Sequence, residues 1–373
     1  MTTNKSEKIK VALVFGTRPE AIKMCPLVKK LKENPKFDVL TIVTAQHRQM
    51  LDSVLNLFEI TPDYDLNLMK PNQNLWNLSS DILLQTKEVF EKEKPDLILV
   101  HGDTTTAGIS ALSAFYSRTK IGHVEAGLRT FDKDYPFPEE INRVLVDSVS
   151  DLMFCPTDKA KENILNSGIK KGIYKTGNTV IDALLYVINN KKDDLEFIEL
   201  DKNLKTILLT SHRRENFGEP LENICKAVKE LVLKNKDIQV VYPMHLNPNV
   251  RNTVKPILEG VERVKLIEPL DYVPFCNLMK KSHIILTDSG GVQEEAPSLG
   301  VPVFVLRDET ERPEALEFGG VKLVGTNKER IEKEIQNVLD NSDVYEKMSK
   351  AINPYGDGKA CEYIEKIILD YFS

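Results

Sequence analysis

Short apolar runs alternate with amphipathic helical stretches along nearly the whole chain. The runs LILV at 97–100 and HIILT at 283–287 are apolar at successive positions, which is typical of strands covered on both faces. Because these runs alternate with helices of about ten to fifteen residues, they indicate βαβ units and parallel sheets. The pattern predicts strands at Lys10–Phe15, Val39–Thr44, Asp96–His101, Gly122–Ala126, Asp151–Cys155 and Ile173–Thr176, and again at Thr206–Thr210, Ile238–Pro243, Val264–Ile267, Ile284–Thr287, Val301–Leu306 and Val321–Val324.

This number of strands is larger than a single open sheet usually contains. The polar, charged stretch Asn189–Lys205 separates the two sets, and we expect it to be a linker or a long helix-to-strand connection. We therefore expect an α/β fold with two Rossmann-like, doubly wound domains that face a cleft, with ligands bound beyond the carboxyl ends of the strands.

Composition and charge fit a globular protein that does not bind nucleic acid. The chain has 373 residues, of which 41% are hydrophobic and 28% charged, and its net charge is −6. The five cysteines, at 25, 155, 225, 276 and 361, are scattered, so we expect buried thiols in a reducing compartment. The polar N-terminus has no apolar signal region, and no run reaches membrane-spanning length, so we expect a cytoplasmic protein.

The first strand end carries one candidate anion site, in FGTRPE. Thr17 and Glu20 have the spacing of a capping box at a helix start, where backbone N–H groups favour an anion. Arg18 and Lys23 lie near that helix start. An arginine at a strand end is equally often a plain surface charge.

The second candidate anion site is TDSGGVQEEAPSLG, which follows an apolar strand. Ser289 is placed to cap the next helix, and Gly290 and Gly291 let the backbone approach a diphosphate. Glu295 lies one turn along on the same face, in reach of ribose hydroxyls. The alternative is a tight turn before a well-capped helix. The chain has no GxGxxG after a strand, no P-loop, no HExxH and no GxSxG, so it predicts no bound dinucleotide and neither zinc-protease nor serine-hydrolase chemistry.

Carboxylates follow several strands of the first half: Asp103, Glu125, and Glu139 with Glu140 in the next loop. Asp103 has a helix N-cap as its competing role, and the paired glutamates can simply complement a helix dipole. Glu125 stands in an apolar context, where a carboxylate is costly unless it is paired or functional. Their convergence at one sheet edge favours catalysis.

His212 follows the first strand of the second half and forms a cationic cluster with Arg213 and Arg214. Such a cluster is suited to a departing diphosphate, although a packing or capping histidine is the alternative. The other histidines near strand ends lack the close spacing of metal ligands, so no metal is expected.

These segments together resemble the non-hydrolysing UDP-N-acetylglucosamine 2-epimerases over essentially the whole chain. The motifs that carry the resemblance occur in family order: FGTRPEAIKMCPL, TAQHRQML, VHGDTTT, GHVEAGLRT, PEEINR, GNTVIDAL, SHRREN, HLNPNVR, LTDSGGVQEEAPSLG, ERPEA and NPYGDG. The family is similar in fold to the GT-B glycosyltransferases, and its last helix returns to the first domain. The resemblance thus implies one domain of residues 1–185 plus 355–373 and a UDP-binding domain of 186–354.

The resemblance implies interconversion of UDP-GlcNAc and UDP-ManNAc without a cofactor, by elimination of UDP to 2-acetamidoglucal and its re-addition. By the resemblance, Asp103, Glu125 and Glu139 would carry out the acid–base chemistry, and Lys23 would lie near the reaction centre. His212 would stabilise the leaving diphosphate, helped by Arg18, Arg143, Gly290 and Gly291. Ser289 and Glu295 would hold phosphate and ribose. Bacterial members also bind a second, regulatory UDP-GlcNAc, for which the matching positions are Gln46, Gln73, Glu140, Arg213 and His245. A homodimer that supplies polysaccharide precursors is the family expectation.

Three other functions compete with the epimerase. A GT-B glycosyltransferase would use the Gly–Gly segment and Glu295 equally well, but the three acids would occupy the space that an acceptor needs. A hydrolysing epimerase would share the scaffold and the intermediate, and would release free ManNAc and UDP. A non-catalytic nucleotide-binding module fits the clustered acids least.

Overall fold

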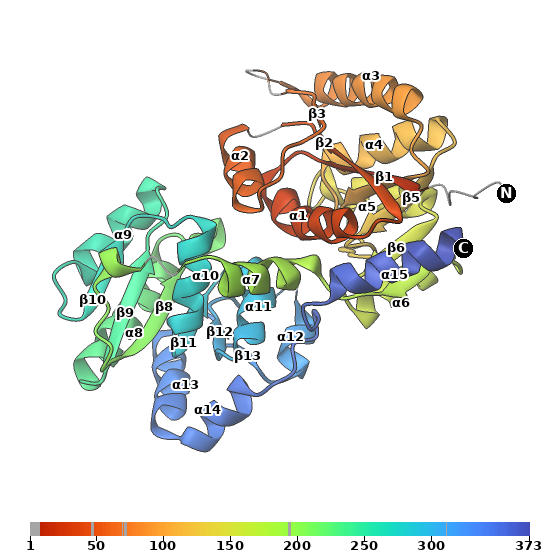
Figure 1. Cartoon of the computed structure of the whole chain (residues 1–373). Coiled ribbons are helices and arrows are strands. Elements are labelled where there is room, and N and C mark those ends of the chain that lie inside the picture. The colour runs from red at the N-terminus through yellow and green to blue at the C-terminus, as the bar shows by residue number, and fades with distance from the viewer. Residues whose placement is uncertain (1–7, 46–47, 69, 71–72, 193–194, 311) are drawn as a thin grey trace. The chain divides into compact units, whose positions relative to one another are not determined.

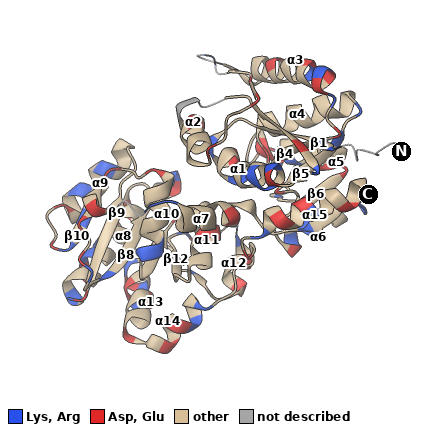
Figure 2. Ribbon diagram, viewed as in Figure 1, with Lys and Arg blue, Asp and Glu red and all other residues tan. Residues whose placement is uncertain are grey.

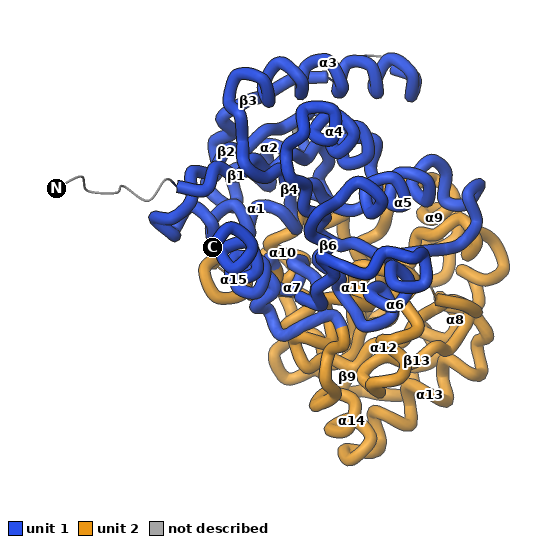
Figure 3. The backbone as a smooth tube through the Cα atoms, turned by 90° about the vertical axis from the view of Figure 1, so that its right-hand side faces the viewer, with its two compact units in different colours: residues 1–183, 355–373 blue, residues 184–354 orange. Residues whose placement is uncertain are grey.

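The computed structural model describes residues 8–45, 48–68, 70, 73–192, 195–310 and 312–373, and these form two compact α/β units (Figure 1). Unit 1 comprises residues 1–183 and 355–373, and unit 2 comprises residues 184–354 (Figure 3). Each unit contains one parallel sheet with helices between its strands. The prediction of two Rossmann-like α/β domains is confirmed.

Among the described residues, unit 1 has a seven-stranded sheet in the order β3-β2-β1-β4-β5-β6-β7. Its strands are β1 (Ile9–Phe15), β2 (Phe37–Val43), β3 (Tyr64–Asp65), β4 (Leu97–His101), β5 (Lys120–Val124), β6 (Leu152–Cys155) and β7 (Ile173–Lys175). Its helices are α1 (Arg18–Glu33), α2 (Arg48–Leu57), α3 (Leu75–Glu93), α4 (Thr105–Tyr116), α5 (Glu139–Val149), α6 (Asp158–Asn166), the first part of α7 (Thr179–Asn190), and α15 (Ala360–Phe372).

Unit 2 has a six-stranded sheet among its described residues, in the order β10-β9-β8-β11-β12-β13. Its strands are β8 (Lys205–Thr210), β9 (Ile238–Pro243), β10 (Val264–Ile267), β11 (Ile284–Thr287), β12 (Val303–Val305) and β13 (Val321–Leu323). Its helices are α8 (Glu219–Lys234), α9 (Pro248–Leu258), α10 (Tyr272–Lys281), α11 (Gly290–Glu295), α12 (Pro313–Glu317), α13 (Lys328–Asp340) and α14 (Ser342–Ser349), with short 3₁₀ turns η1 (Glu196–Ile198), η2 (Arg214–Asn216) and η3 (Ala296–Leu299).

The middle strands form as predicted because their side chains are buried on both faces of each sheet. Every residue of β4 and β11 is buried. In unit 1, β1 pairs in parallel with β2 and β4, and in unit 2, β8 pairs in parallel with β9 and β11. Because the strands of each sheet are parallel, their carboxyl ends lie along a single edge, where ligands of such folds bind.

The capping box that the first strand end predicted is present at the start of α1. The Thr17 side chain accepts a hydrogen bond from the Glu20 amide, and the Glu20 carboxylate accepts one from the Thr17 amide at 2.8 Å. The same carboxylate accepts a hydrogen bond from Thr104 Oγ1 at 2.7 Å, and Thr104 is the N-cap of α4. One buried acid therefore ties together the helix starts that follow β1 and β4.

The structure adds one strand to the predicted elements and decides between two alternatives for the stretch in the middle of the chain. The edge strand β3 was not predicted, since two residues carry no detectable alternation. The polar stretch 189–205, predicted to be a linker or a long helix-to-strand connection, connects α7 to β8. Its described part packs onto unit 2: Leu195 and Ile198 are buried, and Lys265 Nζ donates a hydrogen bond to the Ile198 carbonyl at 2.8 Å. The boundary between the units lies earlier, within α7.

The last helix, α15, belongs to unit 1 and is capped by a side chain from α7. Its own N-cap residue, Lys359, makes no side-chain cap. The Asp182 carboxylate instead accepts hydrogen bonds from the amides of Ala360 at 3.2 Å and Cys361 at 2.9 Å. This contact between distant parts of the chain holds α15 at its place beside α1 (Figure 1).

The prediction of scattered, buried thiols is confirmed, because all five cysteines are free and buried. Figure 2 shows lysines and arginines interspersed with aspartates and glutamates over both units. In the part of the chain that the structure describes, no helix has both the length and the apolar character needed to cross a bilayer.

Candidate active site

Glu125 directly follows β5 and is held by side chains from two other parts of unit 1. Its carboxylate forms an ion pair with Lys23 from α1 and accepts a hydrogen bond from Asn178 Nδ2 at 2.8 Å. Its side chain is only 10% exposed, and its backbone has φ of +65°. A left-handed conformation costs a residue with a Cβ atom about 1–2 kcal/mol, so the surrounding structure holds Glu125 in a strained position.

Asn178 was not predicted as a site residue, although it follows β7 at the same sheet edge. Its backbone N–H donates to the Tyr355 carbonyl at 2.7 Å, and its Oδ1 accepts from the Val180 amide at 3.0 Å. These bonds leave the side-chain amide directed at Glu125. A polar residue after a strand, the signal used for the acids, would have identified it.

His101, the last residue of β4, lies beside Glu125 and is uncharged. Its Nε2 is buried without a hydrogen-bond partner among the described residues and stands 3.8 Å from a Glu125 oxygen. Burial lowers the pKa of His101 to about 3, although the Glu125 charge opposes this shift. The folded protein therefore keeps a neutral imidazole next to its strained acid.

We expect His101 to make the fold sensitive to acid. Its pKa is about 3 in the folded protein and about 6.5 in an unfolded chain, so below pH 6.5 the unfolded chain binds a proton that the folded chain does not. This difference should lower the free energy of unfolding by about 2 kcal/mol between pH 8 and pH 5. Urea denaturation across that range should show the loss in the wild type and a loss smaller by about this amount in His101→Gln. Identical pH dependence in the two proteins would contradict the assignment.

Asp103 follows β4 and forms an ion pair with Arg143 of α5. The alternative role of Asp103 as an N-cap is wrong, because Thr104 caps α4. The Asp103 carbonyl accepts a hydrogen bond from Asn142 Nδ2 at 2.9 Å. Helix α5 thus holds both the side chain and the backbone of Asp103.

A buried histidine fixes the residue before Asp103. His123 Nε2 contacts the carbonyl oxygen of Gly102 at 2.8 Å, and His123 Nδ1 contacts Asp147 of α5 at 2.6 Å. Arg129 also pairs with Asp147, at 2.5 Å. Burial alone would raise the pKa of the Asp147 carboxyl, but His123 and Arg129 together hold this pKa below its usual value. The loop that carries Asp103 is therefore anchored to charged groups inside unit 1.

The two glutamates that begin α5 differ in their surroundings. Glu140 is buried, and its carboxylate accepts hydrogen bonds from the amides of Thr130 and Phe131, both at 3.0 Å, and pairs with Arg143 at 3.1 Å. Glu139 is half-buried, and its carboxylate has no hydrogen-bond or ion-pair partner among the described residues. Within this pair, Glu139 is therefore the acid left available to a ligand.

Arg18 is the first residue of α1 and follows β1, at the edge of the sheet formed by the carboxyl ends of the strands. It is partly exposed and has no hydrogen-bond or ion-pair partner in the described parts of the chain. Since a helix start already favours anions, an unengaged guanidinium there suits a phosphate group.

In unit 2, His212 follows β8 and lies next to Asp288, which follows the neighbouring strand β11. His212 Nδ1 is 3.5 Å from Asp288 Oδ1, and the His212 ring stacks on His245 with ring centres 5.4 Å apart. The His212 side chain is 42% exposed. Burial lowers the pKa of His212, the Asp288 charge opposes that shift, and His245 and Arg213 add to it. Asp288 was not predicted, although an acid directly after a buried strand was the signal used for Asp103.

The Gly290–Gly291 segment opens a helix, as predicted, and the alternative of a tight turn is wrong. Both glycines lie in the first turn of α11 with negative φ, and Ser289 occupies the N-cap position without a side-chain cap. A Cβ atom on Gly290 would stand 3.7 Å from Arg312 Nη2 and 3.8 Å from Arg213 Nη2. Two arginines thus lie beside Gly290, at the start of α11.

Glu295 lies on the same face of α11 as Gly291. Its Oε1 is 3.6 Å from the position of a Cβ atom on Gly291. Its Oε2 accepts a hydrogen bond from the Tyr272 hydroxyl at 3.2 Å, which fixes the direction of the carboxylate.

The residues implied for a second ligand have mixed surroundings. Gln46 lies outside the described residues, and Gln73 has a buried Nε2 without a hydrogen-bond partner among those described. His245 and Arg213 lie near His212, whereas Glu140 is engaged inside unit 1. A regulatory role for this set stays a prediction.

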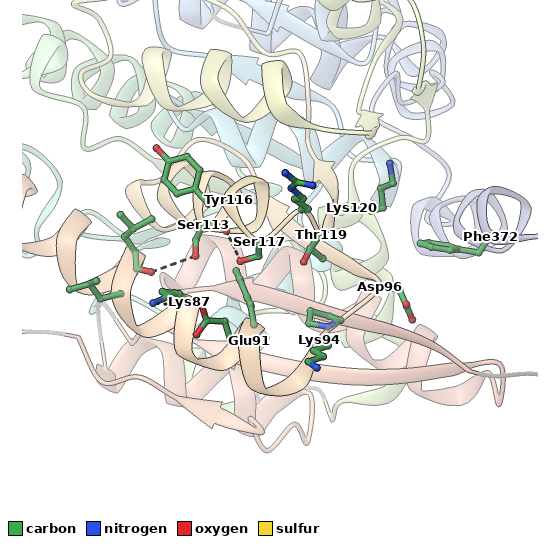
Figure 4. Close-up of a pocket in the computed structure, with 15 residues that line it drawn as sticks. Lys87, Glu91, Lys94, Asp96, Ser113, Tyr116, Ser117, Thr119, Lys120 and Phe372 are labelled. Carbon is green, nitrogen blue, oxygen red and sulfur yellow. Dashed lines mark hydrogen bonds and ion pairs between the residues drawn. The ribbon is translucent and has the colours of Figure 1, made fainter.

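A pocket of about 900 Å³ in unit 1 is lined by none of the candidate site residues (Figure 4). It is lined by α3, α4 and the residues just before and at the start of β4 and β5, including Asp96 and Lys120. These are the amino ends of the strands. Because catalytic groups of parallel sheets gather at the carboxyl ends, this pocket is not the candidate active site.

Comparison with known proteins identifies the family. The sequence profile described as UDP-N-acetylglucosamine 2-epimerase matches residues 29–369. A UDP-N-acetylglucosamine 2-epimerase from Campylobacter jejuni is 52% identical over 372 residues, which cover 96% of this chain and 97% of that protein. Both matches extend over the two units.

Solved structures agree with the sequence matches. A putative UDP-N-acetylglucosamine 2-epimerase from Listeria monocytogenes superposes with a TM-score of 0.93 and 50% identity, covering 98% of this chain and 97% of that chain. The UDP-GlcNAc 2-epimerase from Neisseria meningitidis, solved bound to UDP-GlcNAc, gives a TM-score of 0.86 and 48% identity, covering 97% of this chain and all (100%) of that chain. The chain therefore belongs to the UDP-N-acetylglucosamine 2-epimerase family of enzymes.

Proposed function

We propose that this enzyme interconverts UDP-GlcNAc and UDP-ManNAc by eliminating UDP and adding it back through 2-acetamidoglucal. The observation that carries the proposal is the strained, largely buried Glu125 carboxylate, held by Lys23 and Asn178 at the carboxyl end of β5. Glycine adopts a left-handed backbone without strain, so a charged residue kept in that conformation indicates that its side chain is needed. Backbone strain of this kind is common at catalytic positions.

The elimination needs a base because the C2–H bond of the sugar is not acidic. A carboxylate takes the C2 proton, the electrons form the C1=C2 bond, and the C1–O bond breaks to release UDP. Return of a proton to the opposite face of C2 and attack of UDP on C1 complete the epimerisation. Electrons and atoms balance without an oxidant, so the reaction needs no redox cofactor.

Asp103, Glu125 and Glu139 are the proposed acid–base set. Glu125 and Asp103 are held by cations from α1 and α5, and Glu139 has no partner among the described residues. Three acids are enough to supply both a base and an acid.

The cations are proposed to bind the diphosphate. His212 and Arg213 of unit 2 would meet the charge that grows on UDP as the C1–O bond breaks, and Arg312 and Arg18 would add to the cationic surroundings. Ser289 and the amides of Gly290 and Gly291 would contact phosphate, and Glu295 would accept hydrogen bonds from ribose. The UDP-GlcNAc bound in the Neisseria meningitidis relative supports this choice of ligand.

Isotope exchange tests the proposal directly. Purified enzyme incubated with UDP-GlcNAc in D2O should produce UDP-ManNAc that carries deuterium at C2, with no free sugar accumulating, as followed by NMR. Release of ManNAc and UDP would favour a hydrolysing epimerase instead. A requirement for an added acceptor would favour a glycosyltransferase, and epimerisation without deuterium at C2 would contradict proton exchange with solvent during the cycle.

A further inference from the structure

Asp288 occupies the interior of unit 2, yet its two carboxylate oxygens have different surroundings. Oδ2 accepts hydrogen bonds from Ser211 Oγ at 2.9 Å, from the amides of His212 at 2.8 Å and Arg213 at 2.9 Å, and from Asn216 Nδ2 at 3.0 Å. Asp288 is fully buried. One oxygen therefore shapes the whole loop that follows β8.

The other oxygen, Oδ1, is buried and has no hydrogen-bond partner among the described residues. Nδ1 of His212 faces Asp288 Oδ1, at 3.5 Å. A buried acceptor without a hydrogen-bond partner costs free energy of folding. Its presence next to the His212 imidazole therefore indicates a functional role for Asp288 Oδ1. Contacts of this kind are often long without substrate and shorten when the charge they serve develops.

We propose that Asp288 is a positioning residue that keeps a proton on Nδ1 of His212, so that Nε2 is the nitrogen directed at the diphosphate. The inference rests on the proposed function for the identity of the ligand, whereas the contact itself lies within unit 2. An ionised carboxylate only accepts hydrogen bonds, so Asp288 Oδ1 selects the tautomer with hydrogen on Nδ1. It also stabilises the imidazolium that forms when Nε2 takes up a proton from solvent, so that Nε2–H donates a hydrogen bond to a phosphate oxygen of departing UDP.

The charges around the His212 ring explain why such a partner is useful. His245 stacks on one side of the ring, and both His245 and Arg213 disfavour a second positive charge there. Burial lowers the pKa of His212 further, and Asp288 is the acid that opposes these effects. Without Asp288, the imidazolium would lose its stabilising charge on the protein side.

The substitution Asp288→Asn tests the inference, because its oxygen can still accept from the loop donors while its amide faces His212. The amide N–H would donate to Nδ1 and reverse the tautomer. The same exchange in Ser-His-Asp hydrolases lowers kcat about 10⁴-fold for this reason. Here the histidine donates to a charge rather than carrying the transferred proton, so we expect kcat to fall about 100-fold with KM changed less than about threefold.

Two further measurements separate orientation from general damage. The pH limb of kcat that requires protonated His212 should move to lower pH, because removal of a negative charge lowers the pKa of His212. In ¹⁵N NMR of the ring, His212 should carry its proton on Nδ1 in the wild type and on Nε2 in Asp288→Asn. The matched control is Asp237→Asn, at an exposed ion pair with Lys205, which should change none of these readouts.

An unchanged kcat and an unchanged ring tautomer in Asp288→Asn would overturn the inference. If that variant does not fold, the wild-type ring decides: hydrogen on Nδ1 supports the inference, and hydrogen on Nε2 alone overturns it. The ¹⁵N NMR measurement of the His212 ring also stands if the wild type fails to epimerise UDP-GlcNAc. It needs no turnover, because it is made on the enzyme alone and then with UDP added as the probe. Failure of the proposed function is thus distinguishable from failure of the Asp288 contact.

Discussion

Glu125→Gln should lower the rate of epimerisation about 10³-fold and lower the rate of deuterium entry at C2 by the same factor. The substitution keeps the size of the side chain and an oxygen that can accept the hydrogen bond from Asn178. It removes the charge that pairs with Lys23 and the capacity to take or give a proton. Initial rates in both directions, with UDP-GlcNAc and with UDP-ManNAc, measure the effect.

The matched control is Glu88→Gln on α3, where the side chain is exposed. It makes the same chemical change away from the strand ends, and its rates should equal those of the wild type. Binding of UDP to Glu125→Gln should change by less than about threefold, because the diphosphate is assigned to cations and not to this acid. Turnover of Glu125→Gln within a factor of about three of wild type would remove Glu125 from the acid–base set.

The strand ends could be predicted from the sequence because burial on both faces leaves a continuous apolar run. β4 and β11 have this pattern, and the polar residues that follow them, Asp103 and Asp288, lie at the expected edges. The capping box of Thr17 and Glu20 could be predicted for a similar reason, since it depends on a local spacing. The two-residue strand β3 has too few positions for any pattern.

The contacts that position the candidate groups could not be predicted, because they join residues far apart in the sequence. Asn178 reaches Glu125 across 53 positions, and Asp288 reaches the His212 amide across 76. The Gly290–Gly291 segment was left with two alternatives for another reason: glycine adopts helical and left-handed backbone equally well, so its sequence alone does not distinguish the observed helix start from a tight turn. The resemblance to the epimerase family, which uses the order of all motifs, was confirmed by relatives that match nearly the whole chain.

Gly127→Ala should lower the free energy of unfolding by roughly 3–5 kcal/mol. Gly127 follows Glu125 by two residues and has φ of +86°. An added Cβ atom would stand 2.2 Å from the carbonyl oxygen of Ala160 and 3.0 Å from Ile164 Cδ1, both in α6. The close atom belongs to helix backbone, so the strand end carrying Glu125 has to move away from α6.

Gly168→Ala separates the clash from the backbone strain. Gly168 also lies in unit 1 with positive φ, at +94°, but nothing stands within 4 Å of its added Cβ. It should therefore lose only the left-handed penalty of about 1–2 kcal/mol, while Gly127→Ala should melt about 10 °C below the wild type. Thermal scans give the midpoints, and hydrogen exchange of residues 120–130 should rise in Gly127→Ala alone. Equal losses in the two variants would mean that contact with α6 does not hold the Glu125 loop, and that the conformation of this loop depends on Lys23 and Asn178 instead.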